Sequence, residues 1–502
     1  MTLAHGYIRQ AIREKYLSDP AFAVKIRQNI AAAFAAPSES PRRAEEYPWQ
    51  LFQLADYSKL VVALTVPDFF VQLRKSFFPD LKMYWTSLVA WDRDTGNCLN
   101  NAIVWQCRRT EPMCGELRRD TDLVRKVREH TGLVIDPYFS ATKMRWLLEN
   151  SGRVKDAAER GTLALGTVDS WLLWNLTRGR SFATDITNAS RTMLFNITTG
   201  TWDVELCERF GINPAYLPEV LNSSAFFGEL DEVFFGHRGI PVTGIAGDQQ
   251  AALFGQACFS RGMVKNTYGT GCFIIINTGE EMTPAPEGLV TTVAWKTGPK
   301  PVYAFEGSIF STGAAVQWLR DEMGLLETAG ESQEIAASVP DTGGVYFVPA
   351  FVGLGSPYWD AAARGTMIGI TRGTGRAHVV RAVLESIAFQ TRDVIEAAGK
   401  DGGVIVEELR ADGGASANDL LMQFQADILK VPVIRPRVTE TTALGAAFLA
   451  GLAAEVYEGQ DEIARIWKQD AEFRPGMDSA DADRRYGTWR RAVRRSLEWE
   501  EA

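Results

Sequence analysis

Hydrophobic and polar positions change their pattern at about Trp91. From there onward, short apolar runs alternate with stretches of helical spacing and with glycine turns. The runs expected to form strands are residues 101–106, 132–139, 262–279, 301–310, 343–351 and 406–409, and those expected to form helices are 117–129, 418–429, 445–453 and 484–501. This alternation is typical of an α/β protein. The strand, glycine hairpin and strand that start at Gly262 restart the pattern, which favours two domains with a cleft between them.

Residues 1–90 have a different character. Residues 7–36 are expected to form a helix broken near Pro20, residues 36–48 a linker, and residues 60–66 a strand. This segment carries 11 Lys and Arg against 8 Asp and Glu, and Gly6 is its one glycine before Gly96. We therefore treat residues 1–90 as an atypical N-terminal segment.

Composition limits the class of protein. A chain of 502 residues that is 46% hydrophobic is too long for one core and favours two domains. The net charge of −9 argues against nucleic acid or an anionic membrane as the main partner. Because we find no run of 18 apolar residues, no signal-peptide pattern and only scattered cysteines, we expect a cytoplasmic protein without membrane insertion.

Two glycine-containing stretches suggest sites for an anionic ligand, and a third has a glycine near an expected helix start. In residues 265–279, Thr270 lies in a glycine turn that could cradle a phosphate group or could be an ordinary hairpin. At Gly413–Gly414 a strand turns into a helix, where a nucleotide can approach the backbone, and Asn418 could contact it or cap the helix. Gly313 lies near an expected helix start, with Gln317 one turn further on.

The stretch GIAGDQQAALFG, residues 244–255, offers a candidate catalytic acid. Held in a cleft beside Gln249, Asp248 could orient a substrate hydroxyl and accept its proton during phosphoryl transfer. Such a reaction otherwise needs positioning and neutralisation of charge, usually by Mg²⁺ and backbone donors. The alternative interpretation of Asp248 is a helix N-cap.

Together, these stretches resemble the FGGY carbohydrate-kinase family, and within it the members that phosphorylate glycerol. The matching segments, in family order, are residues 101–110, 132–148, 166–174, 184–196, 244–256, 265–273, 351–360, 383–394 and 442–453. The resemblance implies an α/β fold of two actin-like, ribonuclease-H-like domains with an interdomain cleft, at residues 91–258 and 259–502. The first would hold glycerol and the second the nucleotide.

The resemblance also implies roles for individual residues. Asp248 is similar to the family's catalytic base, and Tyr138 and Gln249 to its glycerol contacts. The residues similar to its nucleotide contacts are Thr270, Gly313, Gln317, Gly414 and Asn418. The implied reaction converts ATP and glycerol to ADP and glycerol 3-phosphate, with Mg²⁺ on ligands that the sequence does not identify. Residues 360–375 could be a subunit contact in a homo-oligomer or an ordinary surface loop.

The N-terminal segment departs from the family pattern. The family's opening D-x-G-T-T-S-x-R hairpin is absent, and Trp85 and Thr86 occupy the Arg and Glu positions of its N-Q-R-E-T stretch. A wrong-frame or wrongly joined translation, a foreign segment or natural divergence would each produce this. Two alternatives to glycerol phosphorylation follow: a catalytically silent relative that binds nucleotide only, or a kinase for another small polyol.

Overall fold

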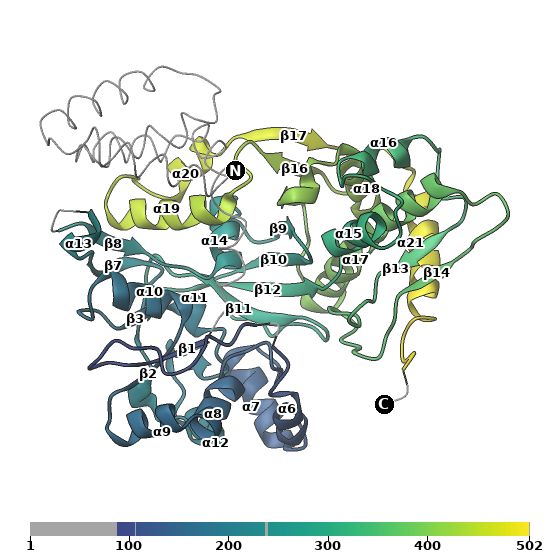
Figure 1. Ribbon diagram of the computed structural model, residues 1–502. Helices are drawn as coiled ribbons and strands as arrows, with labels where there is room; N and C mark the ends of the chain where they lie inside the picture. Colours follow the sequence, from purple (N-terminus) through teal and green to yellow (C-terminus); the bar gives the residue numbers. More distant parts are fainter. Residues whose placement is uncertain (1–87, 106, 236–238, 501–502) are drawn as a thin grey trace, which may run out of the picture. The chain divides into compact units, whose positions relative to one another are not determined.

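The computed structural model describes residues 88–105, 107–235 and 239–500 (Figure 1). The elements expected within residues 7–36, 36–48 and 60–66 lie outside them. The chain divides into two compact units, and the described residues of 88–229 and 241–500 belong to one of these. Helix α13 (Glu232–Phe235) belongs to the other unit.

A seven-stranded sheet forms the centre of the second half of the chain. Its strands are β9 (Met263–Tyr268), β10 (Cys272–Gly279), β11 (Val290–Trp295), β12 (Val302–Ile309), β15 (Glu408–Asp412), β16 (Val433–Pro436) and β17 (Gln469–Phe473). The order is β11-β12-β10-β9-β15-β16-β17. β9, β15 and β16 are parallel and the other neighbours are antiparallel. β9 therefore lies at the centre of the sheet, between its antiparallel hairpin partner β10 and the parallel strand β15.

Helices cover both faces of this sheet. They are α14 (Asp248–Gly255), α15 (Gly313–Asp321), α16 (Glu331–Ala337), α17 (Arg376–Gly402), α18 (Asp419–Leu429), α19 (Thr441–Ala453), α20 (Gln460–Ile466) and α21 (Ser479–Val493), with the short hairpin of β13 (Tyr346–Val348) and β14 (Thr366–Ile368) and the 3₁₀ turn η3 (Gly414–Ala417). Successive side chains of a strand point to opposite faces. On β9, Lys265 contacts Gln249 of α14, and Asn266 contacts Thr391 of α17. α14 and α17 thus lie on opposite faces.

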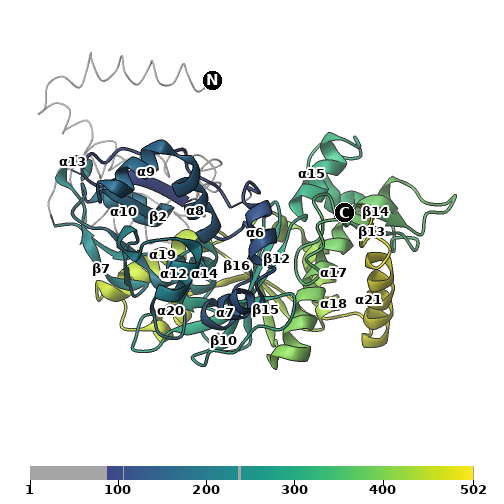
Figure 2. The ribbon, with the colours of Figure 1, turned by 90° about the horizontal axis from the view of Figure 1, so that it is seen from below.

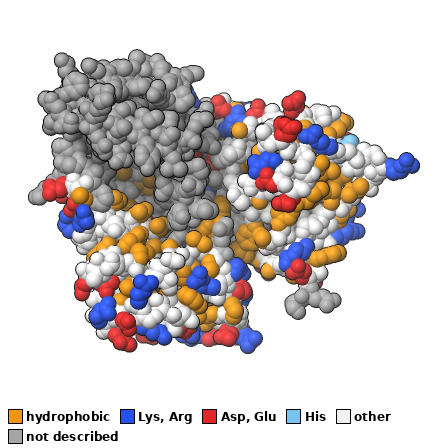
Figure 3. Space-filling model, in the orientation of Figure 1, with side chains coloured by type: hydrophobic (Ala, Val, Ile, Leu, Met, Phe, Trp, Pro, Cys, Tyr) orange, Lys and Arg blue, Asp and Glu red, His pale blue; other side chains and the backbone are white. Residues whose placement is uncertain are grey.

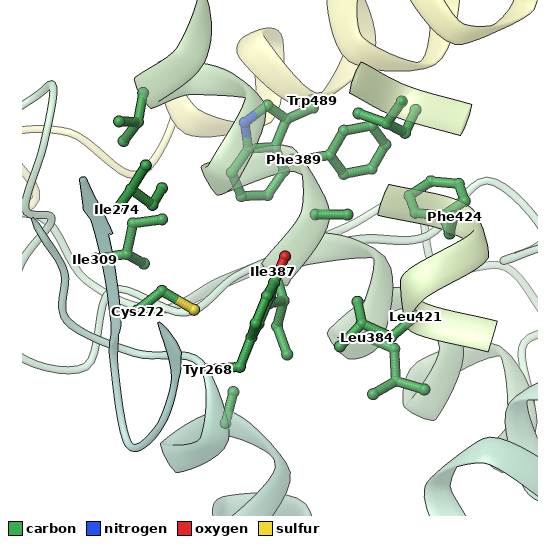
Figure 4. Close-up of a cluster of buried hydrophobic side chains, with 14 of the residues drawn as sticks. Tyr268, Cys272, Ile274, Ile309, Leu384, Ile387, Phe389, Leu421, Phe424 and Trp489 are labelled. Carbon is green, nitrogen blue, oxygen red and sulfur yellow. The ribbon is translucent and has the colours of Figure 1, made fainter. Parts of the chain in front are cut away.

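The larger hydrophobic core lies between the sheet and α17, α18 and α21, which run side by side in Figures 1 and 2. Figure 4 shows Tyr268 of β9 surrounded by apolar side chains from these helices. Its hydroxyl donates a hydrogen bond to Gln425 Oε1 at 2.8 Å. Phe389 and Trp489 stack with ring centroids 5.4 Å apart and so join α17 to α21.

The first half of the described chain has shorter strands. Its elements are β1 (Leu88–Asp92), α6 (Glu111–Leu117), α7 (Thr121–Thr131), α8 (Ala141–Asn150), α9 (Gly152–Glu159), β2 (Leu163–Thr167), α10 (Val168–Leu176), β3 (Ala183–Asp185), α11 (Ile186–Ala189), β4 (Phe195–Asn196), β5 (Thr201–Trp202), α12 (Val204–Phe210), η2 (Pro214–Tyr216), β6 (Glu219–Leu221), β7 (Ser224–Glu229) and β8 (Pro241–Gly244). β1 and β2 pair antiparallel and are buried throughout. The ring of Trp91 packs against those of Trp171 and Phe182, with centroids 5.3 Å apart in each pair.

Local sequence explains the bounds of α7. Asp120 caps the helix by accepting a hydrogen bond from Leu123 N, and Gly132 ends it at a φ of +73°. Leu123, Val127 and Thr131 form a buried stripe at a spacing of four residues. The helix predicted at 117–129 is therefore shifted, because its first turn belongs instead to α6 and to the cap.

Two predicted strands are wrong. In residues 101–105, Ile103 alone makes an isolated bridge, to Leu88, and residues 132–139 form turns. The reason in the second stretch is the Asp136–Pro137 dipeptide, since Asp136 Oδ1 accepts a hydrogen bond from Tyr138 N at 2.8 Å. The predicted strands at 262–279, 301–310, 343–351 and 406–409 are present as β9–β10, β12, β13 and β15.

Helices α14 and α19 touch backbone to backbone. A Cβ added at Gly445 would overlap the carbonyl oxygen of Ala251, and one at Gly255 would overlap that of Thr441. Glycine is thus required here by close approach. The pair α14–α19 joins the first half of the chain to the sheet, since α19 also packs against β8.

The visible surface is mixed in character. On the face shown in Figure 3, basic and acidic side chains are interspersed with hydrophobic ones. Within the described residues, no helix is long and apolar enough to cross a membrane.

Replacing Gly445 by Ala is expected to lower the free energy of unfolding by about 2 kcal/mol or more, because α19 must move away from α14. Thermal and urea unfolding would measure the change. Gly487→Ala is the matched control, since its Cβ would meet open space on helix α21 and should stabilise by roughly 0.5–1 kcal/mol. Equal effects of the two substitutions would contradict the close approach.

Asp393 should make stability depend on pH. Burial raises its pKa to about 7, while Tyr486 and Trp489 each donate a hydrogen bond to its carboxylate at 2.8 Å. The folded chain then holds more protons than the unfolded chain between about pH 4 and 7, so this group's contribution to stability falls as pH rises through that window. The difference in unfolding free energy between the parent and Asp393→Asn should change by a few kcal/mol across it. A difference independent of pH would refute this.

Candidate active site

Asp248 lies at the start of α14, but it does not cap the helix. Gly247 is the N-cap, and its N–H donates to Thr187 Oγ1 at 2.8 Å. The Asp248 side chain instead lines a small pocket with a volume of about 30 Å³. The residues lining this pocket are Tyr138, Phe139, Ser140, Thr167, Asn188, Arg191, Gly247, Asp248, Gln249, Gln250 and Glu306.

A hydrogen-bond relay holds one oxygen of Asp248. Gln249 Nε2 donates to Asp248 Oδ2 at 2.8 Å, and Lys265 Nζ donates to Gln249 Oε1. Since an ammonium group only donates, the Gln249 amide oxygen must face Lys265 and its NH₂ group must face Asp248. Oδ1 accepts no hydrogen bond from any residue in the described ranges. One carboxylate oxygen is therefore fixed and the other is available to a substrate.

Lys265 is fully buried on β9 and also donates to the carbonyl of Phe273 at 3.1 Å. Burial lowers its pKa, while the nearby carboxylates, Asp412 foremost, act in the opposite direction. A buried ammonium group is tolerated when its donors are satisfied and opposite charges surround it. Its position couples the central strand to the start of α14.

Asp185 organises the loop facing Asp248. Its two carboxylate oxygens accept hydrogen bonds from the backbone and side chain of Thr187, the backbone and side chain of Asn188, and Ser223 Oγ. These bonds fix Thr187, which holds the N-cap of α14, and Asn188, which lines the pocket.

Tyr138 and Phe139 form the aromatic wall of the pocket, and Trp105 packs behind Tyr138. The rings of Tyr138 and Trp105 meet edge to face at 5.6 Å, and Trp105 meets Phe273 at 5.8 Å. Burial raises the pKa of Tyr138, and Glu306 adds to the rise, so its phenol stays protonated at neutral pH. The wall offers apolar contact and one hydroxyl, which suits the carbon chain of a small polar molecule.

A buried ion pair forms another wall. Arg191 Nη2 and Glu306 Oε1 are 2.6 Å apart, and the two side chains are 12% and 2% exposed. The Arg191 guanidinium lies 5.6 Å from the ring centroid of Tyr138. The pair brings the loop after α11 onto β12 of the central sheet.

A second group of candidate residues surrounds the glycine hairpin. Thr270 is exposed at the tip between β9 and β10, and its carbonyl accepts hydrogen bonds from Thr312 N and Ala314 N at 3.0 and 3.1 Å. Gly313 N donates to the carbonyl of Gly269 at 3.1 Å. The hairpin thus rests on the N-terminus of α15, and Gln317 lies exposed one turn further on.

The glycine turn after β15 lies against the same strand. Gly413 has a φ of +84°, and a Cβ on it would crowd the backbone of Tyr268 on β9. Gly414 is exposed at the start of η3. Asn418 caps α18 by accepting a hydrogen bond from Leu421 N at 3.0 Å, and it donates to Ser332 Oγ at 3.3 Å.

The structure brings the candidate residues together in two groups. Tyr138, Asp248 and Gln249 line one pocket, and Thr270 adjoins Gly313 at the hairpin. β9 links the groups, because Lys265 contacts Gln249 and the strand runs into the hairpin. Across the described residues there is no cluster of three His, Cys, Asp or Glu side chains able to hold a metal.

Sequence reasoning missed Trp105, Lys265, Arg191, Glu306 and Asp185. All five fall within stretches singled out for resemblance or strand pattern, yet none has a local signal of its own. A charged residue inside an apolar run was the available clue for Lys265 and Glu306, since such residues are seldom buried unpaired.

Comparisons with known proteins identify the family. The models of the N-terminal and C-terminal domains of the FGGY family of carbohydrate kinases match residues 84–255 and 264–454, respectively. Glycerol kinase 2 of Thermotoga maritima is 58% identical over 412 residues, covering 82% of this chain and 83% of the relative. Glycerol kinase of Symbiobacterium thermophilum is 57% identical over 411 residues, covering 82% of each.

Among solved structures, Plasmodium falciparum glycerol kinase with ADP has a TM-score of 0.78 at 39% identity, covering 82% of each chain. A xylulose kinase from Rhodospirillum rubrum has a TM-score of 0.69 at 24% identity, covering 81% of each, which bears on the fold alone. These likenesses confirm the resemblance drawn from the sequence and the α/β fold of two actin-like domains.

Replacing Asp185 by Asn should place an NH₂ group against hydrogen-bond donors in a buried site. We expect a loss of about 2–4 kcal/mol in the free energy of unfolding, measured by urea denaturation. Asp120→Asn is the control, because Asp120 is an exposed N-cap where Asn serves about as well. A loss at Asp185 no larger than that of the control would argue against its role in ordering the loop.

Proposed function

Since the chain belongs to the FGGY family of carbohydrate kinases, we propose that it transfers the terminal phosphoryl group of ATP to glycerol and releases ADP and glycerol 3-phosphate. The reaction would serve glycerol catabolism. The observation that carries the proposal is the carboxylate of Asp248, which lines the pocket with Oδ2 held by Gln249. The glycerol kinases of 57% and 58% identity support this substrate.

The side chains divide the work at the acceptor hydroxyl. Asp248 Oδ1 accepts the proton of the attacking hydroxyl as the bond to phosphorus forms. Gln249 and Lys265 keep the carboxylate in one orientation. Tyr138, whose ring packs edge to face on Trp105, donates a hydrogen bond to the polyol. The carboxylate does not need to reorient during the reaction, which lowers the barrier.

The nucleotide is proposed to bind along the hairpin. Thr270 offers its hydroxyl to the phosphates, and the exposed glycine hairpin beside Gly313 at the start of α15 lets them approach the backbone. Gln317, Gly414 and Asn418 would contact the nucleoside. The exposed position of Thr270 and Gly414 leaves both accessible to a ligand.

Magnesium fits this site as a companion of the nucleotide. Mg²⁺ is commonly held by substrate phosphates with one or two carboxylates, so the phosphates of the nucleotide would supply most of its ligands. When bound, the ion would neutralise charge on the phosphates.

Further proposals concern organisation. We place the first, glycerol-side domain at residues 91–258 and the second, nucleotide-side domain at 259–502. A homo-oligomer through residues 360–375 stays a prediction, and so does the absence of a nucleic-acid partner. The need for ATP favours the cytoplasm as the place of activity.

A second candidate is nucleotide binding without turnover. Residues 1–90 favour it, because they lack the D-x-G-T-T and N-Q-R-E-T elements. The match to the family's N-terminal domain begins only at residue 84. A kinase for another small polyol, with altered contacts around Trp85, is the remaining alternative.

Glycerol-dependent ADP release by the full-length chain with Mg-ATP tests the proposal. Asp248→Asn should lower the turnover number by about 10²–10⁴-fold, because the proton acceptor is lost. Glu116→Gln, an exposed change away from the pocket, should leave it unaltered. A folded parent that binds ATP but releases no ADP would favour the second candidate.

A further inference from the structure

The ion pair of Arg191 and Glu306 leaves two polar atoms without partners. Arg191 Nη2 contacts Glu306 Oε1, and Ser308 Oγ donates to the same oxygen at 3.4 Å. Arg191 Nη1 and Glu306 Oε2 are buried and have no hydrogen-bond partner among the described residues. One donor and one acceptor therefore remain unused on adjoining charged groups.

Unpartnered charged atoms are unfavourable inside a protein. A buried polar atom without a partner destabilises by about 1–3 kcal/mol, and more when it is charged. Both residues also line the pocket that contains Asp248. Most buried polar atoms find a partner in the protein or in ordered water, so two unused atoms on one ion pair require an explanation. The unused atoms are what a ligand group in the pocket would complete.

The chemistry of these atoms selects the ligand group. Nη1 can only donate a hydrogen bond, and the ionised carboxylate oxygen Oε2 can only accept one. A hydroxyl does both at once, whereas an ammonium group, a carboxylate or a carbonyl satisfies one atom and leaves the other.

We infer that Arg191 and Glu306 bind a hydroxyl of the acceptor other than the one that reacts at Asp248, and so select a short polyol over a simple alcohol or diol. The inference rests on the proposed function, because it assigns a further part of the same pocket. Their opposite charges cancel, so the pair binds a neutral polyol without attracting an anion. The guanidinium, packed over Tyr138, is held in place before the ligand enters.

Equilibrium binding of glycerol, 1,2-propanediol and 1,3-propanediol to the full-length chain tests the inference by calorimetry. Each diol lacks one hydroxyl of glycerol. The parent should bind at least one diol about 10–100-fold more weakly than glycerol, because a site built for a hydroxyl is left unpaired without it. In the double variant Arg191→Met with Glu306→Gln, this discrimination should fall to within about threefold, mainly through weaker glycerol binding.

The pair Arg381 and Glu385 provides a matched control. It too is buried, with side chains 16% and 4% exposed, and it lies in α17 with Nε and Oε1 2.9 Å apart. The variant Arg381→Met with Glu385→Gln should keep the parent's preference for glycerol even if its unfolding temperature falls. Glu306→Gln alone is the milder variant, to be used if the double variant fails to fold.

The inference would be overturned if the Arg191 and Glu306 variants kept the parent's preference for glycerol over the diols. It would also be overturned if the parent bound all three ligands equally or bound none of them. Turnover is measured separately. A parent that binds glycerol selectively through this pair but releases no ADP would contradict the proposed function while supporting the inference.

Discussion

The contact between α14 and α19 is the constraint on which the site depends. Gly255 and Gly445 lack side chains, so the two backbones meet directly and α14 cannot shift without overlap. Asp248 is the first residue of α14 and takes its position from that helix. The absence of a side chain at these two glycines is therefore a condition for the position of Asp248 in the pocket.

Around Asp248 the protein buries charged groups and gives each a hydrogen-bond or ion-pair partner. Lys265 and Glu306 are both buried, and each is held by a partner from another element. Removing one member of such a network leaves the others with unpaired charge, which is why the network resists change one residue at a time. The same pairing fixes the direction of each polar group, so the pocket is oriented before any ligand arrives.

The sequence was informative where a signal is local. A glycine between two apolar strands predicted the hairpin at 265–279, and a helix start was expected near Gly313, where α15 begins. The strands predicted at 101–106 and 132–139 failed because an apolar run does not say whether a partner strand is present. Arg191 and Glu306 are 115 residues apart in sequence, and nothing short of the fold shows that they meet. The roles proposed for the candidate residues stay predictions.

The carboxylate of Asp393 receives its hydrogen bonds from Tyr486 and Trp489 on α21, close to the end of the described chain. The core of the second half of the described chain is therefore completed only by α21, the last helix of the described residues. A nascent chain that stops before Tyr486 holds a buried acid without its donors and an exposed face of α17. Premature termination even at this late point should yield a product that cellular proteases remove.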